Sequence, residues 1–191
     1  MAEAQDGAAS IELLRTVYQD HLGKIVTDTQ TRNVAWPDQY ATALKDLHAS
    51  RPGALLLDGG DTWQGSATAL WTKGQDMVDA CKLLGVDVMT GHWEFTLGAD
   101  RVKEIVAKDF AGRIEFVAQN VRTTDFGDPV FRSHVMREVN GVPIAIIGQA
   151  FPYTPIANPR YMIPDWSFGI NDDHMQKMVD EVRAKGAQAV V

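Results

Sequence analysis

The amino-acid sequence predicts a layered α/β domain, because short apolar runs alternate with segments of helical periodicity. Apolar runs at residues 54–58, 86–90 and 114–118 are rich in Leu, Val or Ile and end at turn residues, which is typical of buried strands. The segments that start near Gly74 and Leu97 carry apolar residues three or four positions apart, as one face of a helix does. This alternation predicts central strands with flanking helices.

A β-hairpin is predicted after the third strand. Residues 134–139 and 142–147 are strand-like runs on either side of Asn140-Gly141, a dipeptide that favours the two-residue turn of a hairpin. The segment 148–169 has no regular period, but it carries four prolines and five aromatic residues, which indicates a functional loop rather than disorder. A last helix is expected from about Asp172.

The N-terminal part of the chain differs from the rest. Apolar residues at helical spacing over residues 8–24, and again after Pro37, predict a mostly helical segment at residues 1–52. Residues 53–191 hold the strand and helix alternation. The final run, 187–191, is similar to the start of a further strand, so we expect the chain to be a fragment of a longer protein.

The composition excludes several classes of protein. The chain has 25 acidic and 18 basic residues, a net charge of -7 and no dense basic tract, so the footprint of a nucleic-acid-binding or membrane-binding protein is absent. The first residues lack the cationic and apolar regions of a signal peptide, and no apolar run reaches the ~18 residues of a membrane span. The single cysteine, Cys81, excludes an internal disulfide and is expected to be buried on a helix face.

Two predicted strand ends carry residues that bind divalent cations. Asp61 follows the first strand in a turn with Gly59 and Gly60, and His92 follows the second strand. Because sites in open α/β sheets form at the carboxyl ends of strands, we expect both side chains at the same edge. Carboxylate and imidazole suit Mn or Zn, and a carboxylate can bridge two metal ions ~3.5–4 Å apart. The pair predicts a metal-dependent hydrolase with Asp61 as the bridging ligand.

Each of these residues also has an interpretation without metal. Asp61 is alternatively the cap of the next segment, and a histidine such as His92, taken alone, is more often packed in the fold than a ligand. Glu94 either holds a metal ligand in position without binding the metal itself, or is an exposed loop carboxylate. Asp58 is interpreted as structural. The histidines without a ligand-like neighbourhood are His21, His48, His134 and His174.

The two segments resemble the metal motifs of the calcineurin-like metallophosphoesterases, particularly their 5′-nucleotidase branch. LDGGDTWQGS at residues 57–66 is similar to the second metal motif, and GHWEFT at residues 91–96 is similar to a variant of the Gly-Asn-His-Glu motif. His92 then takes the position of the asparagine ligand, and Trp93 that of the catalytic histidine. This variant and residues 148–159 resemble the SoxB thiosulfohydrolases. The resemblance implies an incomplete metallophosphoesterase-type α/β sandwich over residues 53–191.

The resemblance to SoxB implies a periplasmic enzyme with two manganese ions, which hydrolyses a cysteine S-sulfonate on the SoxYZ carrier protein and releases sulfate. It implies that Asn120 contacts substrate, with loop capping as the alternative. It also implies that residues 151–166 line a channel for the cysteine arm of the carrier, with a packed proline-rich cover as the alternative. The implied metal ligands are Asp61 and His92, and the implied catalytic positions are Glu94 and Trp93.

Other motifs of the family are altered or absent in this sequence. Asp28-Thr29-Gln30 matches the first Asp-x-His motif weakly, with glutamine in place of the ligand histidine, and the later histidine motifs would lie beyond Val191. Since two metal ions need roughly four to six ligands each, we expect these residues alone to bind metal weakly and not to turn over substrate. A 5′-nucleotidase-like phosphoesterase and a non-catalytic carrier-binding module are the alternative functions.

Overall fold

A computed structural model of the chain describes residues 36–191, with side chains from residue 42. The chain divides into two compact units, residues 1–52 and 53–191. Helix α3 (Trp36–Ala49) is the described part of the first unit and agrees with the helix predicted after Pro37. The predictions for the helix at residues 8–24, for His21 and for Asp28-Thr29-Gln30 lie outside the described residues.

The second unit contains a parallel sheet at the positions of the first three predicted strands. Its strands, in spatial order, are β1 (Leu57–Asp58), β2 (Val88–Met89) and β3 (Glu115–Phe116). Each strand is shorter than the apolar run that predicted it, but the hydrogen bonding continues one residue further. The amide of Thr90 donates to the carbonyl of Asp58 over 3.0 Å, and that of Val117 donates to Met89 over 2.9 Å. The carboxyl ends of the three strands therefore meet at one edge.

Helices connect these strands, as the sequence predicts. Helix α5 (Gln75–Leu84) ends at Gly85, whose φ of 79° is the left-handed conformation that glycine adopts most easily. Helix α4 (Ala67–Thr72) has no counterpart among the predicted elements. It begins after Ser66, whose hydroxyl accepts a hydrogen bond from the amide of Ala69 over 3.0 Å. The helical segments between β1 and β3 are α4 (Ala67–Thr72), α5 (Gln75–Leu84), the 3-10 helix η2 (Trp93–Leu97), α6 (Ala99–Glu104) and the π-helix η3 (Ile105–Asp109).

The predicted hairpin is present and forms part of a second sheet. Strands β5 (His134–Val139) and β6 (Val142–Ile147) are antiparallel. Asn140 and Gly141 turn the chain with φ values of 51° and 82°, as a hairpin turn with two left-handed residues requires. Strand β8 (Ala189–Val190) pairs in parallel with β6, so the strand predicted near the end of the chain is also present.

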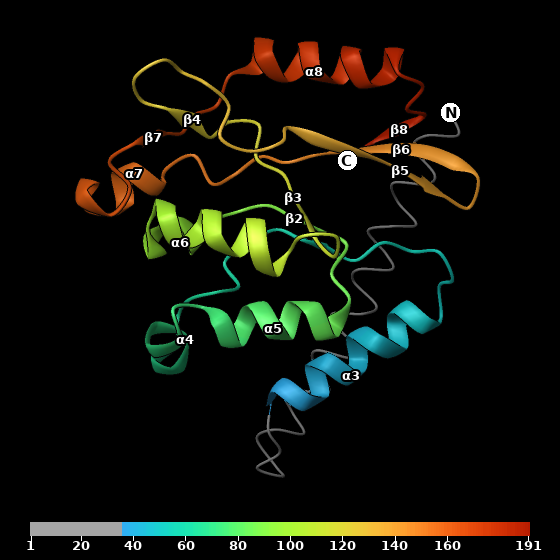
Figure 1. The fold of residues 1–191 in the computed structure, drawn as a ribbon. Helices are drawn as coiled ribbons and strands as arrows, with labels where there is room; N and C mark the ends of the chain where they lie inside the picture. The colour runs from blue at the N-terminus through green and yellow to red at the C-terminus, as the bar shows by residue number, and fades with distance from the viewer. Residues whose placement is uncertain (1–35) are drawn as a thin grey trace. The chain divides into compact units, whose positions relative to one another are not determined.

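The long segment after β6 is ordered but contains only short elements. It holds α7 (Thr154–Ala157), the 3-10 helix η4 (Arg160–Met162) and β7 (Trp166–Ser167), which pairs antiparallel with β4 (Arg122–Thr123). Helix α8 (Asp172–Ala184) follows, at the predicted position, and buries Met178 and Val182. Figure 1 shows α8 on one side of the β5-β6-β8 sheet, and α5 and α6 on the other side of the second unit.

Aromatic rings fill the main core of the second unit. Trp63 meets Phe110 edge-on with 5.4 Å between ring centroids, and Phe95 meets Phe168 in the same way at 4.9 Å. Such edge-to-face pairs add roughly 0.5–1.5 kcal/mol to the burial of apolar area. Cys81 is buried in this cluster, as predicted, and burial raises the pKa of its thiol to about 12. The core therefore lies between the β1-β2-β3 sheet and the helices that follow its strands.

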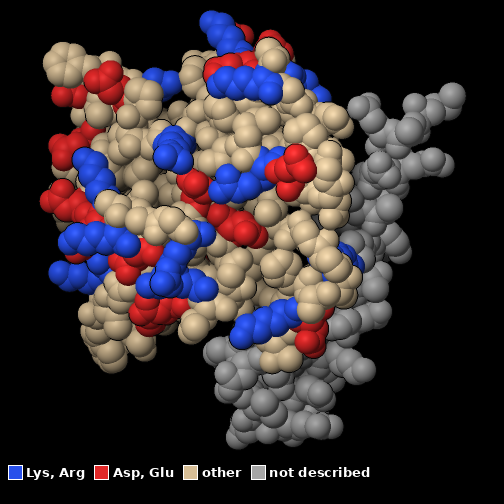
Figure 2. Space-filling view, turned by 45° about the vertical axis from the view of Figure 1, so that its right-hand side comes forward, with Lys and Arg blue, Asp and Glu red and all other residues tan. Residues whose placement is uncertain are grey.

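The surface carries charges of both signs. Figure 2 shows Lys and Arg interspersed with Asp and Glu over one face. Within the described residues, no helix is both long enough and apolar enough to cross a bilayer.

Gly60 lets the loops after β1 and β2 approach each other closely. Its φ is 88°, and a Cβ atom at this position would lie 2.7 Å from the backbone nitrogen of His92. Neither the dihedral angle nor the space suits any other residue. The loop that carries Asp61 can therefore lie directly against the loop that carries His92 only because residue 60 is glycine.

We expect Gly60→Ala to lower the free energy of unfolding by about 1–3 kcal/mol, because alanine would be strained at a positive φ and would also clash with backbone. Urea denaturation measures this change. Gly59→Ala is the matched control, since a Cβ atom added at Gly59 would meet no heavy atom within 4 Å, and this variant should shift stability by less than about 0.5 kcal/mol. Equal stability of the two variants would contradict the close approach of the loops.

Candidate functional site

The structure brings Asp61 and His92 together at the carboxyl edge of the parallel sheet, as the sequence predicts. The Oδ1 atom of Asp61 lies 3.9 Å from Nδ1 of His92. This distance is too long for a hydrogen bond, and Nδ1 of His92 is a buried atom without a hydrogen-bond partner among the described residues. Asp61 has a φ of 64°, and its side chain is half exposed. The imidazole nitrogen and the carboxylate thus face each other across a gap.

The gap between the two atoms fits a cation. A metal ion binds imidazole nitrogen and carboxylate oxygen at about 2.0–2.2 Å, so one ion can reach both atoms across 3.9 Å. The buried lone nitrogen of His92 points to the same role, since buried polar atoms normally have partners. The ligand set is small, because no group of three or more His, Cys, Asp or Glu side chains with metal-site geometry occurs among the described residues. Asp61 and His92 are therefore compatible with a metal centre but do not complete one.

Glu94 holds the two loops of the site together. It is fully buried, and its Oε1 atom accepts hydrogen bonds from the amides of Thr62 over 2.5 Å and Trp63 over 3.3 Å. Its Oε2 atom accepts a hydrogen bond from the amide of His92 over 2.6 Å. The interpretation of Glu94 as an exposed loop carboxylate is wrong. Its carboxylate positions the backbone on both sides of the Asp61–His92 pair, and contact with a substrate stays a prediction.

Asp58 stabilises the turn that presents Asp61. Its Oδ1 atom accepts hydrogen bonds from the amide of Gly60 and the hydroxyl of Thr62, both over 2.9 Å. Burial raises the pKa of this carboxyl above its usual range, although these hydrogen bonds oppose the shift. Asp58 faces the inside of the turn, in keeping with the structural role expected for it.

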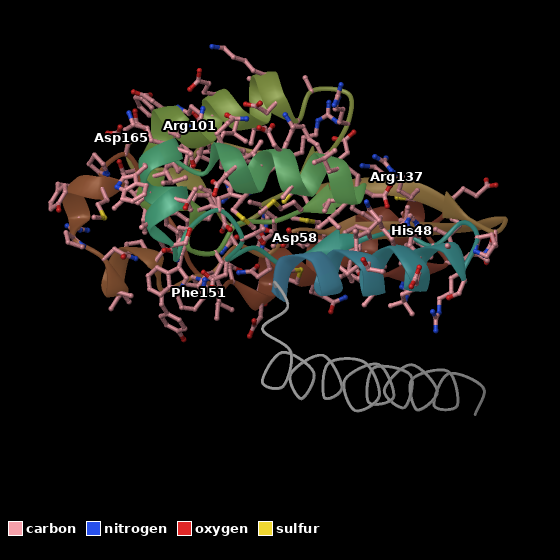
Figure 3. All side chains as sticks on the ribbon, turned by 90° about the horizontal axis from the view of Figure 1, so that it is seen from below. His48, Asp58, Arg101, Arg137, Phe151 and Asp165 are labelled. Atoms are coloured by element: carbon pink, nitrogen blue, oxygen red, sulfur yellow. The ribbon has the colours of Figure 1, made fainter. Side chains whose placement is uncertain are left out.

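An aromatic cover lies on His92. The ring of Phe151 stacks on the imidazole, with 4.0 Å between centroids and 25° between planes, and the ring of Trp93 meets it edge-on at 5.5 Å. The amide of Phe151 donates to the carbonyl of Gly91 over 3.0 Å, and the hydroxyl of Thr154 donates to the carbonyl of His92 over 3.3 Å. In Figure 3, Phe151 lies near the margin of the molecule and Asp58 lies further in. The segment after β6 therefore fixes the ring of His92.

Asn120 is occupied by backbone contacts. Its side-chain nitrogen donates to the carbonyls of Ala150 over 2.8 Å and Gly169 over 3.1 Å, and its oxygen accepts from the amide of Ala150 over 2.8 Å. These contacts match the loop-capping alternative. They leave no free N–H on the side chain, so a substrate could contact Asn120 only through its side-chain oxygen. Contact between Asn120 and a substrate stays a prediction.

One histidine without a predicted role lies in a polar network. Both ring nitrogens of His174 are bonded, Nδ1 to Gln119 over 2.8 Å and Nε2 to Arg122 over 2.9 Å. These partners lie more than fifty positions away in sequence, and no short motif connects them. The sequence indicates only that Gln119 follows the third predicted strand and that His174 lies near the start of the last predicted helix.

Comparisons with known proteins agree with this fold. No family model matches the sequence. The chain is 25% identical over 158 residues to a snake venom 5′-nucleotidase of Naja atra, a match that covers 79% of this chain and 29% of that enzyme. The solved structure of the sulfate thiohydrolase SoxB of Thermus thermophilus superposes with a TM-score of 0.73 and 36% identity, over 78% of this chain and 28% of that one. The calcineurin-like phosphoesterase YfkN of Bacillus subtilis shares the fold, with a TM-score of 0.66 and 18% identity over 78% of this chain and 50% of that one.

These likenesses confirm the predicted fold class. The chain carries part of the calcineurin-like phosphoesterase fold and is a partial member of the superfamily that includes the 5′-nucleotidases and SoxB. The relatives named are hydrolases, so the superfamily is one of hydrolases. The chain spans less than a third of the length of the venom enzyme and of SoxB.

We expect Glu94→Gln to lower the free energy of unfolding by about 2–3 kcal/mol, because an amide group cannot accept hydrogen bonds from all three backbone N–H groups and would leave one unsatisfied. Urea denaturation followed by circular dichroism measures the change. Glu104→Gln is the matched control, since Glu104 is exposed and its ion pairs lie on the surface, so the unfolding midpoint should hardly move. Similar midpoints for both variants would show that Glu94 does not hold the loops.

Proposed function

We propose that the chain is part of a metal-dependent thiosulfohydrolase of the SoxB type. In this proposal the protein hydrolyses a cysteine S-sulfonate on a SoxYZ-like carrier protein in the periplasm and releases sulfate. The observation that carries the proposal is Trp93. Read without gaps from Glu94, the motif resembles that of the family with Trp93 in the place of the catalytic histidine, and its ring lies against His92. The likeness to SoxB at 36% identity supports it.

Trp93 favours a leaving group that needs no proton. An alkoxide leaves with a conjugate acid whose pKa is near the ~15.7 of water, so protonation by a histidine accelerates its departure greatly. A cysteine thiolate has a conjugate acid of pKa about 8.5 and leaves without such help. The indole N–H of tryptophan does not ionise and cannot replace the histidine as an acid. A site with Trp93 therefore suits a sulfur–sulfur bond better than a phosphate ester.

Asp61 and His92 would hold the metal in this enzyme, with Asp61 shared between two manganese ions. Bound ions of this kind supply Lewis-acid stabilisation of the charge on the sulfonate oxygens and lower the pKa of water. Glu94 holds the loop that carries Asp61 beside the loop that carries His92 through its three backbone hydrogen bonds. Phe151 and Trp93 keep the imidazole of His92 in one orientation, and Phe151 covers one of its faces.

The segment after Phe151 offers a surface for the carrier. Tyr153, Ile156 and Tyr161 are exposed there, at 53%, 81% and 77% of their full areas. A groove of about 560 Å³ runs beside them. Its wall is formed by proline and apolar residues, among them Pro152, Ile156, Tyr161, Trp166 and Phe168. An exposed aromatic and proline-rich groove suits an extended peptide arm, and its neighbour Phe151 lies on His92.

A 5′-nucleotidase-like phosphoesterase is the second candidate function. The identity of 25% to a venom 5′-nucleotidase over 79% of this chain favours it. A panel of nucleotides and a peptide with cysteine S-sulfonate, assayed with a full-length homologue, separates the two activities. Hydrolysis of the peptide alone supports the proposal, and hydrolysis of the nucleotides alone overturns it.

Trp93→His in a full-length homologue should raise phosphoesterase activity at least tenfold, because a general acid contributes about 10²–10⁴-fold to the departure of an alkoxide. Initial rates with p-nitrobenzyl phosphate and with AMP measure this gain. Trp71→His is the control, since Trp71 lies 79% exposed on α4, and its rates should equal those of the unmodified enzyme. An unchanged rate in the Trp93 variant would count against the leaving-group argument.

We expect the 191-residue chain itself to bind Mn²⁺ weakly, with a dissociation constant in the millimolar range, and to show no turnover, because residues 36–191 supply only two good ligands. Paramagnetic broadening of the His92 ring signals during a Mn²⁺ titration measures the binding. Asp61→Asn should weaken the broadening, whereas Asp100→Asn, at an exposed position on α6, should not. Tight binding of two Mn²⁺ ions together with hydrolysis would contradict the expectation.

A non-catalytic module that binds the carrier is the remaining alternative. Pull-down of the carrier by the chain in the presence of a chelator, with no catalysis, would favour it.

A further inference from the structure

A second pocket lies between the β4-β7 pair and the start of α8. We propose that this pocket binds the anionic end of a small organic ligand and that Arg122 is the cation that holds it. The pocket has a volume of about 470 Å³, within the roughly 300–1,000 Å³ of typical ligand sites. Its lining residues include Gln119, Arg122, Ser167, Phe168, Ile170 and His174. The pocket contains none of the candidate metal ligands. It is also lined by Asn120, whose side chain is bonded to the backbone of Ala150 and Gly169, and the proposed role of Arg122 does not depend on the hydrolytic function.

Arg122 is a half-buried cation without an acidic partner. No carboxylate among the described residues forms an ion pair with it. Its guanidinium donates one hydrogen bond to the carbonyl of Gly127 and one to Nε2 of His174, both over 2.9 Å. A guanidinium has five N–H donors, so three of them have no partner within the described part of the chain. Free donors on a fixed guanidinium match the two oxygens of a carboxylate, phosphate or sulfonate.

A chain of hydrogen bonds fixes the orientation of Arg122. Since arginine only donates, Nε2 of His174 must accept, and Nδ1 must therefore carry the proton that it donates to Gln119 over 2.8 Å. The amide of Gln119 donates in turn to Gln149, whose own amide donates to the carbonyl of Gly169 over 3.2 Å. Three side chains thus order the guanidinium before a ligand arrives, which lowers the entropy lost on binding.

The walls of the pocket define the ligand class. Phe168 and Ile170 line it with apolar surface, and Ile170 is 64% exposed. Asp172 and Asp173, the acidic residues that lie next to lining residues in the sequence, are exposed on the first turn of α8 and do not line the pocket. The pocket has room for more than a lone inorganic ion, and apolar walls favour a ligand with an apolar body. A small organic oxyanion would pair its charge with the guanidinium of Arg122 and pack its apolar body against the walls of the pocket.

Phenyl phosphate is a suitable probe for this pocket. Titrated into the ¹⁵N-labelled chain with EDTA present, it should produce saturable shifts of the Nε–H signal of Arg122 and of the amides of residues 167–171. Phenol, which lacks the charge, and inorganic phosphate, which lacks the ring, should each bind at least tenfold more weakly. EDTA removes metal from the Asp61–His92 site, so a positive result is independent of that site and of the proposed hydrolase.

Variants connect the binding to Arg122. Arg122→Gln should weaken phenyl phosphate at least tenfold, and Arg160→Gln, at an exposed arginine beside the other groove, should leave the affinity unchanged. Asp173→Asn should strengthen binding, because it removes a nearby negative charge. If Arg122→Gln does not fold, the shift map of the unmodified chain and the affinity of Arg122→Lys decide the question. Absence of saturable shifts, shifts spread over surface lysines, or equal affinity in a folded Arg122→Gln would overturn the proposal.

Discussion

The carboxylate of Glu94 is the contact on which the site depends. Neighbouring parallel strands bring Asp61 and His92 to one edge, but the loops that follow the strands are free to diverge. Glu94 accepts hydrogen bonds from backbone on both loops while it is fully buried. A buried charge is tolerated only when its hydrogen-bonding capacity is used. The same three contacts that satisfy the carboxylate therefore determine the distance between the two candidate ligands.

The fold was largely predictable because its signals are local. Alternating periodicity located the parallel strands, and Asn140-Gly141 alone located the hairpin, whose turn has the two positive φ angles that this dipeptide favours. The pairing of Asp61 with His92 followed from a rule of topology, that parallel strands share a carboxyl edge. Helix α4 was missed because it is only six residues long, and its one signal, the capping hydroxyl of Ser66, is common in loops.

The contacts that order the site were not predictable from sequence. Phe151 and His92 are far apart along the chain, and their stacking depends on the path of a segment with no regular period. Glu94 sits in a recognisable motif, but the direction of its side chain depends on how tightly the two loops approach. That approach rests on Gly60, where a Cβ atom would meet the backbone of His92. The network from Arg122 to Gln149 joins a strand end, a helix start and a loop, and only packing creates it.

His92 and Trp93 together limit the chemistry that this edge of the sheet can perform. The Nδ1 atom of His92 is buried, faces Asp61 at 3.9 Å and has no hydrogen-bond partner among the described residues, so it is placed where a cation could bind it. Trp93 meets the imidazole edge-on and has no group that could protonate an alkoxide, and Phe151 stacks on a face of the imidazole. In the proposed enzyme, which has no histidine at position 93 to donate a proton, the stabilisation needed for bond cleavage would come from charge stabilisation and from a leaving group that is stable as an anion. A thiolate meets that condition and an alkoxide does not, so the proposed cleavage of a sulfur–sulfur bond rests on Trp93 more than on the metal ligands.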